Sequence, residues 1–301
     1  MPGCGSRKFI SWFITLILII LRYPFSAEGV ISAQPTETLE VTFIDVGQGD
    51  SSLLRTSSGI DVLIDAGPES AGDGVLSFLN SKGVTELDVI VISHNHADHL
   101  GGLVAILQSP IDIGVVLYNG NTCTTLICQE VWVEIEKREI TPQAAAAGDS
   151  FTWGSLTSAV LNPQSTGSGD ENEDSIVLHV DFYEVDLLYT GDIGFATETT
   201  LLDAAALTPV EVLKVAHHGS ATSTSAEFLD AVVPQKAVIS VGVENTYGHP
   251  SEETLTRLAD SGAAVHRTDL VGTTSFRFSP DGAEIVTLLI YLPLMRHGSG
   301  Q

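Results

Sequence analysis

The segment that most constrains this chain is residues 93–102, Ser-His-Asn-His-Ala-Asp-His-Leu-Gly-Gly. The apolar run at residues 87–92 directly before it is rich in β-branched side chains, which is typical of a buried strand. A loop that follows a rigid strand can turn neighbouring side chains toward one point. Four side chains that commonly bind metal ions are therefore expected to converge where this strand ends: His94, His96, Asp98 and His99.

The chemistry of these four side chains indicates a metal site. Imidazole and carboxylate together suit Zn²⁺, Mn²⁺ or iron, and the segment contains no cysteine, which argues against a closed structural zinc site. The alternative is a solvated loop whose histidines are satisfied by local hydrogen bonds. Four mixed ligands followed by Gly-Gly are a far more specific pattern than that. We therefore expect one or two divalent ions in an open, hydrolytic site, with Zn²⁺ as the first candidate and Mn²⁺ as the alternative.

Five motifs follow one another along the chain. They are Val-Gly-Gln-Gly-Asp-Ser at 46–51, the histidine segment at 94–102, Leu-Tyr-Thr-Gly-Asp at 188–192, Lys-Val-Ala-His-His-Gly-Ser at 214–220, and Asn-Thr-Tyr-Gly-His-Pro at 245–250. In this order they resemble the motifs of the metallo-β-lactamase-fold hydrolases, and more closely those of the hydrolase domain of the ComEC-type DNA-uptake proteins, in a stand-alone exported form. The resemblance covers nearly everything after about residue 39.

The resemblance implies further metal ligands at other strand ends. Asp192 would bridge two ions, and His217 would join Asp98 and His99 on the second ion. A carboxylate has two oxygens and can hold two ions about 3.5–4 Å apart. Taken alone, Asp192 would be a turn aspartate and His217 a capping or core histidine, and only the whole array changes these interpretations.

The chain departs from the wider family at the first ion, to which typical members supply a third histidine. The only histidine between the His99 and Asp192 motifs is His179, which lies inside a predicted strand and is interpreted as structural. The first ion would then be held by His94, His96 and Asp192, with water or a weak oxygen ligand. This implies a lower affinity, a preference for harder ions such as Mn²⁺, or a single occupied site.

Catalytic and substrate-contacting residues are also predicted. Metal-bound water is acidic enough to supply hydroxide at pH 7, and Asp98 is placed to orient it. His218 and His249 are candidates for contacting substrate or protonating the leaving group. For His249 the alternative is a turn before a helix cap at Ser251, and for residues 48–51 it is a tight turn between strands. The remaining residues expected around the site are Gln48, Asp50, Asn172, Ser175, Ser220, Asn245 and Tyr247.

Strands and helices alternate along the chain, which predicts an α/β (α+β) protein with two sheets packed face to face and helices outside. The resemblance supplies the name of this fold, the αββα sandwich with two mixed β-sheets, within one domain at residues 34–301. The predicted strands are 39–46, 51–55, 60–65, 87–92, 113–117, 156–161, 176–182, 186–189, 210–215 and 237–241. The predicted helices are 72–82, 100–108, 124–138, 195–206, 225–232 and 252–261.

Residues 1–33 are expected to be a signal peptide or an N-terminal membrane anchor. Arg7 and Lys8 precede an apolar run at residues 9–21, which is shorter than the roughly twenty residues of a spanning helix. The protein is therefore expected outside the cytoplasm, secreted or tethered to the membrane through residues 9–21. In an oxidising compartment Cys123 and Cys128 would form a disulfide, and otherwise they would be free thiols.

The leading functional hypothesis is an exported metal-dependent hydrolase of phosphodiesters, nuclease-like and with DNA among its substrates. The net charge of −25 argues for weak attraction to a polyanion, although bound cations can reverse the potential inside a cleft. Since no long apolar span follows residue 21, no transport channel is expected in this chain. The alternatives are a hydrolase of small-molecule ester, thioester or amide bonds, including β-lactams, and a non-catalytic metal-binding extracellular module.

Overall fold

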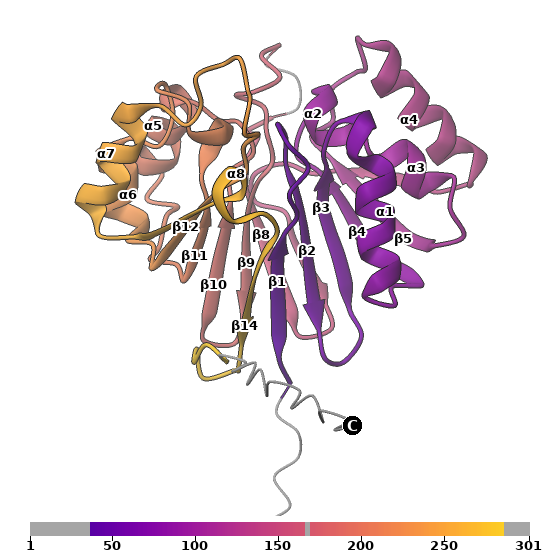
Figure 1. The fold of residues 1–301 in the computed structure, drawn as a ribbon, viewed down its shortest axis with the longest axis horizontal. Coiled ribbons are helices and arrows are strands. Elements are labelled where there is room, and N and C mark those ends of the chain that lie inside the picture. Colours follow the sequence, from indigo (N-terminus) through magenta and orange to yellow (C-terminus); the bar gives the residue numbers. More distant parts are fainter. Residues whose placement is uncertain (1–36, 166–168, 286–301) are drawn as a thin grey trace, which may run out of the picture. The chain divides into compact units, whose positions relative to one another are not determined.

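Two β-sheets pack face to face, and helices cover the outer surface of each sheet (Figure 1). The computed structural model describes residues 37–165 and 169–285. The expected signal or anchor segment at residues 1–33 lies outside the described residues. Within the described part of the chain, no helix combines the length and apolar character that crossing a membrane requires.

The first sheet has seven strands in the order β14-β1-β2-β3-β4-β5-β6 and is mixed. Strands β14, β1, β2 and β3 are antiparallel, whereas β3, β4, β5 and β6 are parallel. Its strands are β1 (Leu39–Phe43), β2 (Ser51–Thr56), β3 (Asp61–Ala66), β4 (Glu86–Ile92), β5 (Asp112–Tyr118), β6 (Pro142–Ala144) and β14 (Thr274–Phe278). Helices α1 (Gly72–Ser81), α3 (Leu103–Leu107) and α4 (Leu126–Lys137) cover its outer face.

The second sheet also has seven strands, in the order β13-β12-β11-β10-β9-β8-β7. Strands β7 to β10 are antiparallel and β10 to β13 are parallel. Its strands are β7 (Ser150–Trp153), β8 (Leu156–Asn162), β9 (Val177–Phe182), β10 (Val185–Tyr189), β11 (Val212–Lys214), β12 (Lys236–Ile239) and β13 (Ala264–Arg267). Helices α5 (Phe195–Asp203), α6 (Ala226–Val232) and α7 (Glu252–Ser261) cover its outer face.

Some apolar side chains pack between the two sheets, and others pack between each sheet and the helices that cover it. In β4, Val89 and Val91 join the core between the sheets, whereas Ile90 and Ile92 pack with the helices α1 and α3. Because successive side chains of a strand point to opposite faces, a strand covered on both sides must be apolar throughout. The four consecutive apolar residues at 89–92, directly before the histidine segment, are explained in this way, and the predicted fold class is confirmed.

One predicted helix is wrong in its extent. In place of a single helix at residues 100–108, the chain forms α2 (Ala97–Leu100) and α3, with a break at Gly101 and Gly102. A Cβ atom at Gly102 would lie 2.1 Å from the carbonyl oxygen of Ala66, so only glycine allows this close approach of the two backbones. Because α2 begins at Ala97, Asp98 and His99 lie in a helical turn, and not in an open loop.

The other differences lie at the edges of the sheets. The strand expected at residues 39–46 ends at Phe43, the helix predicted at residues 252–261 has the bounds of α7, and the other predicted elements differ by a few residues at one or both ends. No predicted element corresponds to β6, β7, β13 or β14, nor to the short helices η1 (Glu69–Ala71), η2 (Ala216–Gly219) and α8 (Thr268–Val271). The predicted disulfide between Cys123 and Cys128 is present just before and within the first turn of α4.

Candidate metal centre

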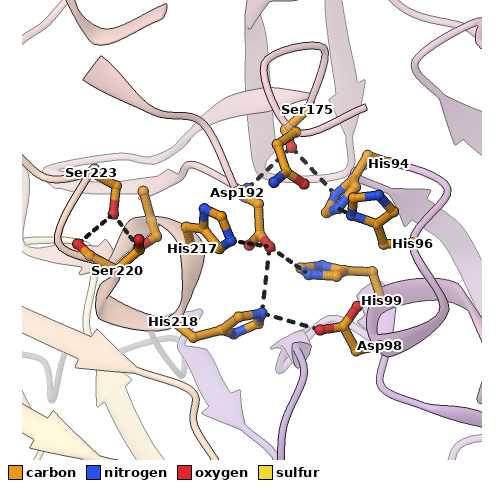
Figure 2. Close-up of polar contacts among 12 residues, drawn as sticks. His94, His96, Asp98, His99, Ser175, Asp192, His217, His218, Ser220 and Ser223 are labelled. Carbon is orange, nitrogen blue, oxygen red and sulfur yellow. Dashed lines mark hydrogen bonds and ion pairs between the residues drawn. The ribbon is translucent and has the colours of Figure 1, made fainter. Parts of the chain in front are cut away.

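The candidate ligands come from the carboxyl ends of strands in both sheets. His94 follows β4, Asp192 follows β10, and His218 lies in η2 directly after β11. Parallel strands end at the same edge of a sheet, so the two sheets bring these residues together at one end of the sandwich. Figure 2 shows Asp192 in the middle, between the histidine segment of the first sheet and the two histidines of η2.

Nitrogen and oxygen atoms converge around the Asp192 carboxylate. Its Oδ2 lies 3.3 Å from His99 Nε2 and 3.4 Å from His218 Nε2, and His218 Nε2 lies 3.5 Å from Asp98 Oδ2. In two overlapping sets every donor atom lies within 4.8 Å of the others. The first set is His94, His99 and Asp192, and the second is Asp98, His99 and His218.

The residues present fit divalent metal ions. The buried atoms His99 Nε2, His218 Nε2 and Asp192 Oδ1 have no hydrogen-bond partner, although buried polar atoms are normally satisfied. His94 Nε2 and His96 Nδ1 also face each other at 3.0 Å beside this group. Imidazole nitrogens and carboxylate oxygens that converge without partners are the donor set that Zn²⁺ and Mn²⁺ bind.

The two consecutive histidines, of which His217 is predicted to bind metal and His218 to contact substrate, differ in burial and direction. Their backbones are left-handed, with φ of 50° at His217 and 53° at His218, so their rings point in different directions. The His218 side chain is 2% exposed and faces Asp192 and Asp98, whereas the His217 side chain is 28% exposed with Nε2 3.9 Å from Asp192 Oδ2. The geometry therefore favours His218 as the ligand of the second ion and places His217 at the wall of the pocket.

Two buried carboxylates orient His99 and His218 by contacting the ring nitrogen Nδ1, while Nε2 faces the metal centre. His99 Nδ1 lies 2.8 Å from Asp65 Oδ2, and His218 Nδ1 lies 3.2 Å from Asp50 Oδ1 and 2.9 Å from the Ser240 carbonyl oxygen. Metal-binding histidines usually donate their second ring N–H to such an acceptor, which fixes the ring and its tautomer. Asp65 has no place among the predicted site residues, although it ends a strand just as His94 does.

A buried lysine compensates the negative charge of the Asp50 carboxylate. Lys214 Nζ lies 2.6 Å from Asp50 Oδ2 and donates to the Val215 carbonyl oxygen at 2.8 Å. Lys214 begins the motif at residues 214–220 and is not among the predicted site residues, but its side chain is buried next to the candidate ligands. The chain of contacts runs from Lys214 through Asp50 to His218.

Four more predicted residues line the pocket above the centre, which has a volume of about 340 Å³: Gln48, Asn172, Tyr247 and His249. The loop that carries His249 packs closely on η2, because Gly219 lacks the Cβ that would lie 2.6 Å from Pro250 Cβ. Ser251 also caps α7, as the alternative interpretation of this turn required. His249 therefore precedes a capped helix and also faces the pocket.

The other predicted residues support the site without facing the pocket. Ser175 Oγ accepts from the backbone N–H of Asp192 at 3.0 Å and lies 3.3 Å from His94 Nδ1. Asn245 donates to the carbonyl oxygens of Gly242 and His249, whereas Ser220 Oγ contacts Thr222 Oγ1 beside η2. His179, interpreted as structural, lies in β9 with Nε2 3.1 Å from Asp186 Oδ1.

Metal binding at pH 7 is expected to release protons. Burial disfavours protonation of His99 and His218, but Asp192 and the carboxylates behind the rings outweigh it and raise the pKa of each ring well above 6.5. Both rings are then protonated in the metal-free protein and must lose a proton to bind an ion. The apparent metal affinity should rise by about tenfold per pH unit for each displaced proton.

Isothermal titration calorimetry with Zn²⁺ in buffers of different ionisation enthalpy measures this release. We expect about one to two protons per chain at pH 7. His94 is not expected to contribute, because burial and the neighbouring His99 hold its pKa well below 6.5. A binding enthalpy that does not depend on the buffer would contradict this description of the metal-free centre.

The chain matches the family model of the β-lactamase superfamily domain over residues 61–239. Competence protein ComA of Neisseria gonorrhoeae is 33% identical over 291 residues, covering 96% of this chain and 38% of that protein. ComE operon protein 3 of Bacillus subtilis is 29% identical over 297 residues, covering 93% of this chain and 36% of that protein. The chain thus spans less than two fifths of the length of these relatives.

The fold is also similar to that of a solved structure. The crystal structure of YhfI, a metallo-β-lactamase fold protein from Bacillus subtilis, matches with a TM-score of 0.53 and 14% identity. The match covers 80% of this chain and 100% of that chain. This likeness supports the predicted αββα fold, and the family match and the two relatives confirm the resemblance to ComEC-type proteins. The chain therefore belongs to the metallo-β-lactamase superfamily of metal-dependent hydrolases, and it is similar to ComEC-type proteins.

Proposed function

We propose that this chain is an exported metal-dependent phosphodiesterase. The observation that carries the proposal is the position of the Asp192 carboxylate between the two sets of donor atoms. Two divalent ions, when bound, supply a nucleophilic water at neutral pH and stabilise both the attacking and the leaving oxygen of an in-line displacement at phosphorus. Asp192 belongs to the first set, and its Oδ2 also lies 3.4 Å from His218 Nε2 of the second set, so this carboxylate is placed to serve both ions of such a site.

The chain's own residues bind and orient the substrate in this proposal. Asp98 is a third exposed and lies on the pocket floor, where its carboxylate can orient the attacking water. Burial and the neighbouring His217 lower the pKa of His249, so at pH 7 its neutral imidazole contacts the substrate and is poorly suited to act as an acid. Asn172 also lines the pocket, and its buried Oδ1 has no hydrogen-bond partner among the described residues.

Separate features support the proposed metal, the proposed substrate and the proposed compartment. Histidine and aspartate ligands support Zn²⁺ as the first candidate and Mn²⁺ as the alternative. One relative is named a competence protein, which supports a nucleic-acid phosphodiester as substrate. The disulfide between Cys123 and Cys128 supports an oxidising compartment, in agreement with a signal or anchor at residues 1–33. We propose that the protein is secreted or tethered to the membrane.

Hydrolysis of bis(p-nitrophenyl) phosphate by the full-length chain tests the function. The protein stripped of metal should be inactive, and it should gain activity with Mn²⁺ or Zn²⁺. Replacing Asp98 by asparagine should lower kcat by at least about 100-fold, because it weakens the second metal site and the orientation of water. The matched control is Asp230→Asn in α6, an exposed carboxylate that should leave kcat unchanged.

The alternatives give different results in the same assay. Turnover of a chromogenic β-lactam or ester without diester hydrolysis would favour a hydrolase of small molecules. Bound metal with no turnover of any of these substrates would favour the non-catalytic module.

A further inference from the structure

A row of aromatic rings leads from the metal centre to the rim of the pocket. His217 lies beside Asp192, its ring centroid is 5.5 Å from that of His249, and the His249 ring stacks on Tyr247 at 5.8 Å with an interplanar angle of 27°. Tyr247 is 68% exposed although it lines the pocket. One face of the Tyr247 ring is therefore covered by His249, and the ring remains open to a ligand above the pocket.

Hydrogen bonds of one asparagine hold Tyr247 in this place. The Asn245 side chain donates to the carbonyl oxygens of Gly242 at 2.9 Å and of His249 at 2.7 Å. Its Oδ1 accepts from the backbone N–H groups of Tyr247 at 3.2 Å and His249 at 3.0 Å. The loop is thus built to present an aromatic ring, since the hydrogen bonds fix the backbone while the ring itself stays exposed.

The charges around the pocket are unsuited to binding a polyanion along its backbone. Among the described residues that line the pocket, none is a lysine or an arginine. An adjoining pocket of about 320 Å³ shares Asn172, Asp192 and His217 with it and is lined by Asp170 and Glu173. A long phosphate backbone would meet carboxylates on this side, and cations in the metal centre would be the attraction for a single phosphate.

We propose that the site binds one nucleotide unit, with its phosphate at the metal centre and the adjacent base stacked on Tyr247. The inference rests on the proposed phosphodiesterase function and specifies its substrate as a short or terminal single-stranded diester with a base. Stacking of a base on an aromatic side chain provides affinity without charge, which suits a pocket wall that offers no cationic side chain.

The dinucleotide d(TpT) and its two analogues that carry a tetrahydrofuran abasic residue on one side test the inference. Wild-type protein with Mn²⁺ should prefer d(TpT) to one of the abasic analogues by roughly 5- to 150-fold in kcat/KM. Tyr247→Leu should lower kcat/KM for d(TpT) by a similar factor and change that of this abasic diester by less than ~2-fold. Tyr247→Phe, which keeps the ring, should retain both values.

A distant tyrosine and a salt series complete the experiment. Tyr183 is 55% exposed and its hydroxyl contacts Glu37, so Tyr183→Leu removes an exposed ring away from the pocket and should change nothing. Raising the salt from about 50 to 200 mM should lower kcat/KM by less than ~3-fold for d(TpT) and for longer strands alike, since a single bound phosphate contributes little to a salt dependence.

The outcomes separate this inference from the function on which it rests. Equal kcat/KM for all three diesters, or equal losses in Tyr247→Leu with every diester, would overturn the stacking role while leaving a phosphodiesterase. A salt dependence of roughly 10³-fold on longer strands would indicate backbone binding and overturn the single-nucleotide mode. If the wild-type protein with metal hydrolyses none of the diesters, the proposed function itself is wrong.

Discussion

Replacing Asp192 by alanine is expected to lower kcat for phosphodiesters by at least roughly 10³-fold and to remove at least one bound ion per chain. The carboxylate is buried and stands 3.3 Å from His99 Nε2 and 3.4 Å from His218 Nε2. Its pKa is held well below 3.8, since the positive rings of His218 and His99 outweigh the burial that opposes its ionisation. It is thus the anionic group at which the two ligand sets meet.

Metal content measured by mass spectrometry, together with kcat, checks this expectation. Asp203→Ala is the matched control, because it removes an exposed carboxylate at the end of α5 on the same sheet. A variant that lacks the Asp192 carboxylate yet keeps two ions and wild-type turnover would show that the two sites do not share it. Loss of both ions would indicate that the sites fill together.

Replacing Lys214 by methionine should lower the free energy of unfolding of the metal-free protein by about 3–5 kcal/mol. Lys214 is 3% exposed, and its ammonium group is 2.6 Å from the Asp50 carboxylate. Burial opposes ionisation of Asp50, but Lys214 and His218 outweigh it and lower its pKa below 3.8. Without the lysine the carboxylate stays buried with less compensation, and its pKa rises.

Urea unfolding as a function of pH measures the effect and its sign. In the wild type, the depressed pKa of Asp50 contributes stability above the unfolded pKa of about 3.9, and that stability is lost as the pH falls through the folded pKa. The Lys214→Met deficit should therefore be largest near neutral pH and shrink in acid, where Asp50 becomes protonated.

A second substitution separates charge from packing. Asp50→Asn combined with Lys214→Met should recover most of the lost stability at neutral pH, since no unpaired charge remains. Lys137→Met removes an exposed ammonium group from its ion pair with Glu134 and should cost much less than Lys214→Met. Equal losses for Lys214→Met and Lys137→Met, or no recovery in the double variant, would contradict the charge-balancing role.

The parts of the fold that sequence patterns predict well are those with local signals. The apolar run that became β4 and the ligands after it stand next to one another in the chain, so periodicity and motif spacing are sufficient. Strand β14 has only a short local signal. Thr274–Phe278 alternates between buried and exposed side chains over five residues, and it pairs with β1, which lies more than two hundred residues earlier. Such a long-range pairing is not visible in a single sequence.

The metal centre was predictable for its ligand types and less so for their directions. The motifs predict that His94 and Asp192 lie close together, because both follow strand ends. They cannot show which of two consecutive histidines faces the metal centre. That choice depends on left-handed backbone at both His217 and His218, an uncommon conformation outside glycine that only the surrounding structure specifies. The buried positions of Asp65 and Lys214 likewise depend on neighbours from other strands.

The measurement that tests the central claim most directly is a titration of the metal-free full-length chain with Mn²⁺ and, separately, with Zn²⁺, in which bound metal and bis(p-nitrophenyl) phosphate hydrolysis are followed together. We predict that hydrolysis appears only with bound metal, reaches its maximum as the second site fills, and falls strongly in His218→Ala but less in His217→Ala. Two ions bound per chain without diester hydrolysis would contradict the phosphodiesterase, and a chain that binds neither metal would contradict the metal centre itself.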